Sequence, residues 1–145
     1  MKKFDYYMPE SLQEAFRLME SQRGRARYIA GGTDVIVRIK QRAIEPDALV
    51  SLRHIRDLAG VHWNGGLRLG STTVFRDIER DPEIARAYPA LHRAVSVLAN
   101  PQVRNVATLG GNLANAAPSA DCAPPLLVLG AVAEIEGPGG SREVP

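Results

Sequence analysis

Two short glycine-rich turns carry the residue types that suit binding of a phosphorylated ligand. The first reads IAGGTD from Ile29 to Asp34, and the second reads ATLGGN from Ala107 to Asn112. Paired glycines let backbone N–H groups come close to a ligand, because no Cβ blocks the approach and a positive φ is cheap. A neighbouring Thr or Asn adds a side-chain donor, and successive amides form a concavity that suits phosphate oxygens. The pair of turns therefore predicts two backbone walls around a diphosphate group.

Each turn also has a simpler interpretation as a tight connection between two elements, which is what a lone Gly-Gly pair usually is. The second turn lies in a segment from Val103 to Pro118 that has little helical or strand periodicity and mixes Asn and Thr with small apolar residues. The backbone of such a segment can be buried only if another group satisfies its hydrogen bonds. A bound cofactor could do so.

The remaining residues form no recognisable catalytic or metal-binding pattern. His54, His62 and His92 are too dispersed to suggest a zinc site. The single cysteine, Cys122, excludes an intrachain disulfide and a cysteine-ligated iron–sulfur cluster built by this chain alone, and it is expected to be a small buried side chain. This absence fits a protein whose cofactor performs the chemistry.

The composition is ordinary for a globular domain, with 145 residues, 45% of them hydrophobic and 23% charged. A net charge of +2 is too small to predict a nucleic-acid partner, and two basic clusters, at 23–27 and 38–42, are expected to form solvated faces. No run approaches the length of a membrane span, and the N-terminus has no apolar signal segment. We therefore expect a cytoplasmic protein.

The turns need elements that position them, and the first is expected in an N-terminal β-α-β lobe over residues 1–57. Ser11 and Glu14 have the spacing of a capping box that opens a helix, and Gly24 ends it. The first glycine turn is expected between a strand and a second helix, where the helix dipole favours anions. The predicted strands cover residues 4–7, 27–30 and 48–52, and the second helix carries Val35, Ile36 and Ile39.

Residues 58–145 are expected to form a second α+β lobe. Asn64-Gly65-Gly66 predicts a hairpin between strands at 60–63 and 67–70. Helices are expected to begin at Thr72, at Asp81-Pro82 and at Pro89, the last of them ending at Asn100-Pro101. Asp121 is expected to cap a helix that runs through Leu129, and a final hairpin turns at 137–140.

The segment PQVRNVATLGGN, from Pro101 to Asn112, resembles a motif of the FAD-binding medium subunit of the molybdenum hydroxylase family, which includes xanthine dehydrogenases, carbon monoxide dehydrogenase and hydroxybenzoyl-CoA reductases. AGGTD at 30–34 matches the family's first flavin motif, and 119–127 matches the stretch after its second. The resemblance implies an α+β, two-lobed FAD-binding domain of the vanillyl-alcohol-oxidase (PCMH) type, with FAD between the lobes. Because family subunits are considerably longer, the domain is expected to be truncated at its C-terminus.

The resemblance implies that the first turn meets the pyrophosphate, that the second supplies the opposite wall, and that Asn115 and Asp121 contact the ribityl or diphosphate end. Leu98 stands where some relatives place an aromatic residue against the flavin. No catalytic residue and no metal ligand is implied. The implied cofactor-binding residues are Ile29, Ala30, Gly31, Gly32, Thr33, Asp34, Leu98, Thr108, Leu109, Gly110, Gly111, Asn112, Asn115 and Asp121.

The implied function is electron transfer through FAD. Relatives that attach flavin covalently carry a His in the first glycine loop, which is absent here, so non-covalent FAD is expected. Molybdopterin would lie on a large partner subunit and iron–sulfur clusters on a small one, with NAD or a quinone as the acceptor. Two alternatives remain open: a self-contained flavin reductase, and a truncated, non-catalytic assembly module.

Overall fold

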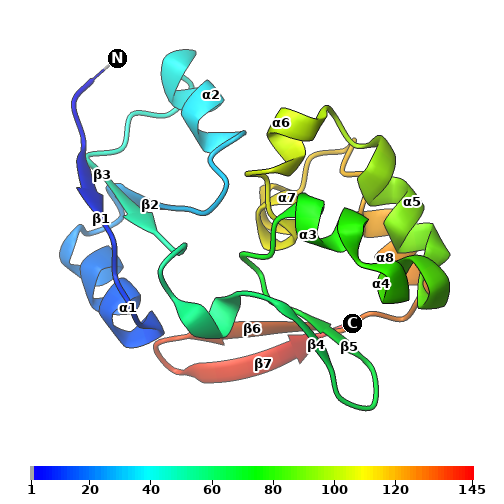
Figure 1. Ribbon diagram of the computed structural model, residues 1–145. Coiled ribbons are helices and arrows are strands. Elements are labelled where there is room, and N and C mark those ends of the chain that lie inside the picture. Colours follow the sequence, from blue (N-terminus) through cyan, green and yellow to red (C-terminus); the bar gives the residue numbers. More distant parts are fainter. Residues whose placement is uncertain (1) are drawn as a thin grey trace.

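A parallel three-stranded sheet forms the centre of the N-terminal lobe in this computed structural model, which describes residues 2–145 (Figure 1). The central strand is buried along its whole length, and its side chains alternate between two faces. Ala48 and Val50 pack with the first helix, whereas Leu49 packs with Ile39 of the second. The sheet order is β1-β3-β2, with β1 at Asp5–Tyr7, β2 at Ala26–Ile29 and β3 at Ala48–Ser51.

The two helices of this lobe begin where the sequence predicts. Helix α1 (Leu12–Ser21) starts at Ser11, whose hydroxyl accepts a hydrogen bond from the Glu14 N–H at 3.2 Å. The reciprocal bond differs from a full capping box, because the Glu14 carboxylate accepts from the N–H of Glu10 at 3.1 Å. Helix α2 (Val35–Lys40) follows the first glycine turn directly.

Short helices build the second lobe around a core that includes Phe75, Ile84, Leu91 and Cys122. Asp81 caps α4 as predicted, because its carboxylate accepts from the N–H groups of the helix's second and third residues. The helices are α3 (Phe75–Arg80), α4 (Pro82–Ala87), α5 (Pro89–Val97), α6 (Pro101–Arg104), α7 (Leu109–Asn115) and α8 (Ala123–Val128).

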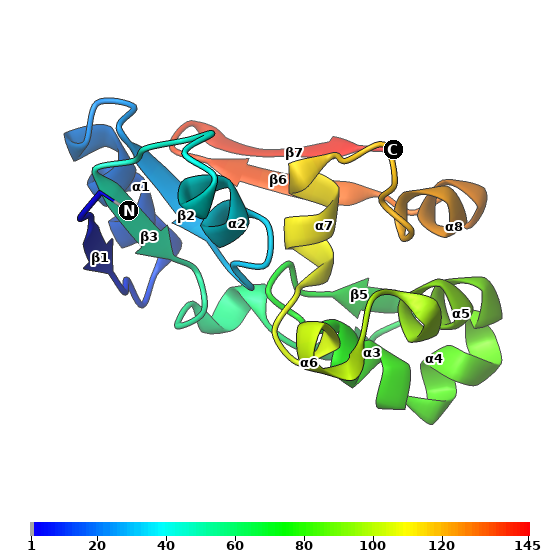
Figure 2. The same cartoon turned by 90° about the horizontal axis from the view of Figure 1, so that it is seen from above.

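Two antiparallel hairpins complete the fold and agree with the predicted turns. The first, β4 (Val61–Trp63) with β5 (Leu67–Leu69), is joined to the helices by stacking of Trp63 on Tyr88. The second, β6 (Ala133–Gly137) with β7 (Gly140–Val144), follows the helices of the second lobe and extends alongside the N-terminal lobe (Figures 1 and 2). An ion pair of 2.9 Å between Arg68 and Glu134 links the two hairpins. None of the helices within residues 2–145 has the length and apolarity needed to cross a bilayer.

The clearest correction concerns the second glycine segment, in which helical periodicity is weak but a helix forms. Helix α7 begins just after Thr108 and includes both glycines of the motif in its first turn. Glycine costs less there than in a helix interior, because the first N–H groups of a helix have no intrahelical partner. In this seven-residue helix only Leu109 is buried, so no apolar stripe indicates it.

Two expected helix caps do not form, and both helices begin without a side-chain cap. The hydroxyl of Thr72 donates to the carbonyl of Leu58 at 2.8 Å, and α3 starts only at Phe75. Helix α8 starts after Cys122 without a side-chain cap, so Asp121 does not cap it. Thr72 and Asp121 both precede the N-cap residue of their helix, which is Val74 for α3 and Cys122 for α8.

The third correction concerns Asn100-Pro101, which begins a helix as well as following the end of α5. The Asn100 side chain accepts a hydrogen bond from the N–H of Val103 at 2.9 Å and so caps α6. Division of the chain at residues 57 and 58 stays a prediction, although the short 3-10 helix η1 (Arg56–Leu58) lies at this junction.

Candidate cofactor-binding site

The two glycine turns meet in the structure through a direct backbone contact. A Cβ atom on Gly31 would lie 2.4 Å from the carbonyl oxygen of Val106 and 2.8 Å from the Cα of Ala107. Real Cβ atoms essentially never approach other atoms this closely, so a residue other than glycine would require the backbone to shift. Both views of the ribbon show the loop between β2 and α2 beside the start of α7 (Figures 1 and 2). The first turn therefore lies against the segment that leads into the second.

The first turn presents backbone donors that the rest of the described chain leaves unused. Among residues 2–145, no group accepts a hydrogen bond from the backbone N–H groups of residues 31–34. Gly31, Gly32 and Thr33 are half-buried, and Gly32 has a φ of +80°, which glycine adopts without strain. Partly buried donors of this kind need an external partner, either water or a ligand. The arrangement suits an anion with several acceptor oxygens.

One side-chain hydrogen bond joins α7 to the first turn, and a second joins the segment after β3 to the residue before the second turn. The Asn115 side chain of α7 donates from Nδ2 to Asp34 Oδ1 at 3.1 Å. The guanidinium of Arg53 donates to the carbonyl of Val106 at 3.5 Å, a long bond. Asp34 and Asn115 are both exposed, so their bond crosses the rim of the contact.

The second turn uses most of its donors internally. The Thr108 hydroxyl accepts a hydrogen bond from the Gly111 N–H at 3.1 Å and so caps α7. The N–H of Gly110 donates to the carbonyl of Ser71 at 2.9 Å. A Cβ on Gly110 would lie 2.6 Å from that same oxygen, so Gly110 is required for packing within the protein. By contrast, a Cβ on Gly111 would meet only the Thr108 hydroxyl, at 2.8 Å.

Asn112 supplies a polar atom that lacks a partner. Its Oδ1 atom is buried, and no donor among residues 2–145 reaches it. A buried acceptor without a hydrogen bond is costly, so this oxygen is available to a donor from a ligand or a water molecule. Asn112 lies one residue beyond Gly111, on the second turn itself.

The other predicted residues occupy three different environments. Ile29 packs with Ile39 and Leu49 in the first lobe, whereas Leu98 and Leu109 belong to the core of the second. These three side chains are therefore part of the hydrophobic cores of the two lobes. Ala30 is half-buried beside Gly31. Asp121 lies beyond α7, exposed, and no hydrogen bond joins its side chain to either turn in the described part of the chain. Direct contact of any of these residues with a cofactor stays a prediction.

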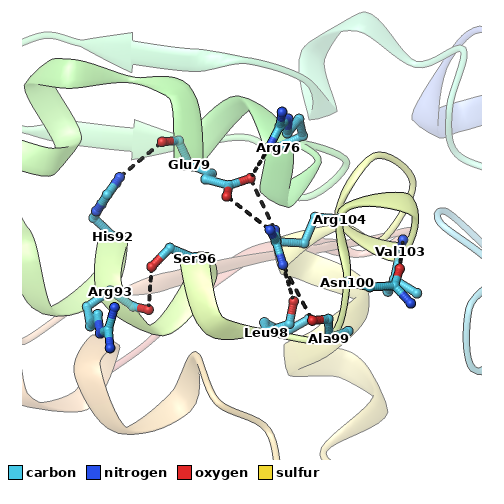
Figure 3. Close-up of polar contacts among 10 residues, drawn as sticks. All are labelled: Arg76, Glu79, His92, Arg93, Ser96, Leu98, Ala99, Asn100, Val103 and Arg104. Atoms are coloured by element: carbon cyan, nitrogen blue, oxygen red, sulfur yellow. Dashed lines mark hydrogen bonds and ion pairs between the residues drawn. The ribbon is translucent and has the colours of Figure 1, made fainter.

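Sequence reasoning did not single out two residues that lie against the second turn or in the segment before it. Ser71 carries no signal, because its role depends only on the approach of Gly110. Arg104, only 8% exposed, binds Glu79 of α3 (Figure 3). The only available signal for Arg104 was a single charge between Val103 and Val106.

Two titratable groups of the second lobe, Cys122 and Glu79, have clearly shifted pKa values. Burial and the nearby charge of Asp121 raise the pKa of the Cys122 thiol to about 12. Hydrogen bonds from Arg104 and Arg76 lower the pKa of the Glu79 carboxyl. Within residues 2–145, no three His, Cys, Asp or Glu side chains are grouped to hold a metal ion.

Comparison with known proteins identifies the family of the chain. Residues 2–145 match the family model described as the FAD binding domain in molybdopterin dehydrogenase. The chain is 39% identical over 142 residues to a putative xanthine dehydrogenase FAD-binding subunit of Escherichia coli, covering 97% of this chain and 48% of that protein. It is 33% identical over 144 residues to the carbon monoxide dehydrogenase medium chain of Hydrogenophaga pseudoflava, covering 99% of this chain and 50% of the relative.

Solved structures show the same fold. Reconstituted carbon monoxide dehydrogenase from Oligotropha carboxidovorans matches with a TM-score of 0.94 and 35% identity, over 99% of this chain and 50% of that one. Quinoline 2-oxidoreductase from Pseudomonas putida matches with a TM-score of 0.93 and 33% identity, over 99% and 51%. The chain spans about half the length of the curated relatives it matches. These matches confirm the predicted α+β flavin-domain fold, and the chain belongs to the family of FAD-binding domains of molybdopterin dehydrogenases.

Proposed function

We propose that this chain binds FAD non-covalently at its two glycine turns and is the FAD-carrying electron-transfer part of a molybdenum-containing hydroxylase or dehydrogenase. The observation that carries the proposal is the contact of Gly31 with Val106 and Ala107, which brings the unused N–H groups of the first turn beside the second turn. The family to which the chain belongs supports the identity of the ligand.

The residues at the turns fit a diphosphate. The free N–H groups of residues 31–34 can donate to phosphate oxygens, and such charge-assisted bonds are stronger than neutral ones. On the opposite wall, the Thr108 hydroxyl and the Ser71 carbonyl hold the glycines of α7 in place. The unpartnered Oδ1 of Asn112 can accept a hydrogen bond from a hydroxyl of the ligand.

When bound, FAD supplies the redox chemistry by accepting and releasing electrons. This chain's residues hold and orient the cofactor. Neither glycine turn contains a His or Cys that could attach a flavin covalently, which supports non-covalent binding.

The partners follow from the family. The similar proteins are named as subunits or medium chains of dehydrogenases, so we infer a large molybdopterin-binding subunit and a small iron–sulfur subunit. Electrons would pass from the iron–sulfur clusters to FAD and on to NAD or a quinone, in the cytoplasm. The single cysteine supports placing the clusters on another chain.

Titration of the purified chain with FAD, followed by flavin fluorescence, tests the proposal. The variant Gly31→Ala should bind FAD at least about tenfold more weakly than the unchanged chain. Its Cβ would overlap the Val106 carbonyl and push the Val106–Ala107 backbone away from the first turn. Gly139→Ala is the matched control, since a Cβ there meets no atom within 4 Å. Equal affinities for the two variants, with folding checked by circular dichroism, would contradict the proposed site.

The same preparation distinguishes the alternative functions. A folded chain that binds no FAD would favour the assembly module. Efficient turnover of NADH with an organic acceptor by the chain alone would favour a self-contained reductase. The proposal predicts FAD binding with at most slow, unspecific diaphorase activity, and substrate-dependent flavin reduction only when the partner subunits are present.

A further inference from the structure

An ion pair between buried Arg104 and half-buried Glu79 lies beside the loop that leads into the second glycine turn (Figure 3). Arg104 donates from Nε and Nη2 to the two carboxylate oxygens of Glu79, each at 3.1 Å. Its remaining terminal nitrogen, Nη1, donates to the carbonyl of Leu98 at 2.9 Å and to that of Ala99 at 3.5 Å. One guanidinium therefore joins α3, the end of α5 and the end of α6.

The two carbonyls that Arg104 binds lie just beyond the end of α5. Carbonyls at a helix C-terminus lack intrahelical partners, and a cation there is favoured by the helix dipole. Ala99 has a φ of +47°, the left-handed region that residues other than glycine rarely adopt. The backbone is thus held in a costly conformation, and the Arg104 side chain is the group that bonds to it.

The loop that contains Arg104 leads into Val106 and Ala107, the backbone segment that contacts Gly31 and forms one wall of the candidate site. Two residues after Arg104, the Val106 carbonyl lies against Gly31, and the Ala107 carbonyl accepts a hydrogen bond from the N–H of Phe75 at 3.0 Å. We propose that Arg104 is a positioning residue: through Glu79 and the carbonyls of Leu98 and Ala99, it fixes the backbone wall at Val106–Ala107. This inference rests on the proposed function for its effect on FAD, but its effect on the wall can be measured without the cofactor.

The Arg104–Glu79 ion pair is better explained by its fixed bonding geometry than by a contribution to stability. Burying two charges costs desolvation energy that their attraction often only balances, so such a pair is weak evidence for stability. A planar guanidinium can satisfy a carboxylate and a carbonyl at fixed angles at the same time, which a lysine ammonium does not do. Arg76 also donates to Glu79 Oε2, at 2.7 Å, so Glu79 keeps a partner when Arg104 is changed.

Hydrogen exchange on the full chain tests the effect on the wall directly. The reporters are the N–H of Phe75, which donates to the Ala107 carbonyl at 3.0 Å, and the N–H of Ala107, which donates to the Val103 carbonyl at 2.8 Å. In Arg104→Lys both amides should exchange about tenfold faster than in the unchanged chain. The matched control is Arg86→Lys in the same lobe, because Arg86 pairs with Glu83 at 3.8 Å on the exposed surface. Unchanged exchange at the wall in Arg104→Lys would overturn the inference. If Arg104→Lys fails to fold, Glu79→Gln provides the same comparison.

FAD and riboflavin affinities test the consequence for the site. Arg104→Lys should lose about tenfold in FAD affinity while riboflavin, which lacks the diphosphate, binds as before. If Arg104 had only a general structural role, Arg104→Lys would lower the affinities for FAD and riboflavin equally. That result would contradict the inference. If the unchanged chain binds no FAD, the proposed function fails, and the exchange rates still decide whether Arg104 fixes the wall.

Discussion

Asn115 and Asp34, separated by 81 positions in the chain, form a hydrogen bond of 3.1 Å between α7 and the first glycine turn. Both residues were expected to contact the cofactor itself. In the structure each is the hydrogen-bond partner of the other, and their direct contact with a cofactor stays a prediction. Their bond joins the two walls at the surface, so their effect on a ligand can be indirect.

The first prediction concerns this bond. Asn115→Ala should weaken FAD binding by a few-fold and leave the unfolding temperature almost unchanged, because a bond between exposed groups contributes about 0.5–1.5 kcal/mol or less. Fluorescence titration and thermal unfolding measure the two effects. The control is Asn64→Ala in the exposed β4–β5 turn. If Asn115→Ala loses no more FAD affinity than Asn64→Ala, the Asn115–Asp34 bond has no role in FAD binding.

The second prediction concerns Gly111. Gly111→Val should abolish FAD binding while most of the fold remains, because its side chain would occupy space beside the predicted diphosphate position. Its Cβ would also press on the Thr108 hydroxyl at 2.8 Å, and loss of such a cap costs about 0.5–2 kcal/mol. Circular dichroism together with flavin content measures both. A folded variant that retains flavin would show that this turn is only a connection.

The third prediction compares two exposed carboxylates. Asp121→Ala should weaken FAD binding more than Asp57→Ala, because Asp121 follows the second glycine motif at the spacing of the family. Loss of a hydrogen bond to a charged acceptor costs about 1.5–3 kcal/mol, roughly ten- to hundredfold in affinity. The dissociation constants of the two variants provide the comparison. Equal values would exclude Asp121 from the site.

The fourth prediction concerns the buried thiol of Cys122. Because burial first and the charge of Asp121 second raise its pKa from 9.0 to about 12, iodoacetamide should not label the folded chain at pH 8. A raised pKa in the folded state means that the thiol's contribution to stability is complete below pH 9.0 and is lost as pH rises toward about 12. Mass spectrometry with and without denaturant measures the labelling, and rapid labelling of the folded chain would show that the thiol is accessible.

Local spacing in the sequence predicted the elements that short-range hydrogen bonds define. Ser11 and Asp81 cap their helices as predicted, and the Asn64–Gly66 turn forms its hairpin. Such features depend on residues two to four positions apart, so their residue types are sufficient to indicate them. Where several groups compete for one bond, the prediction failed, as at Thr72, whose hydroxyl binds Leu58 instead of capping α3.

The sequence by itself determined that two glycine turns with neighbouring hydroxyl and amide side chains exist, and its motif indicated the family. Only the tertiary structure decided what each glycine does: Gly31 permits contact with Val106, Gly110 permits contact with Ser71, and the Thr108 hydroxyl is occupied in capping α7. It also decided that Arg104 binds Glu79 across 25 positions. These contacts arise because packing brings distant backbone segments together, and no local spacing encodes which segments will meet.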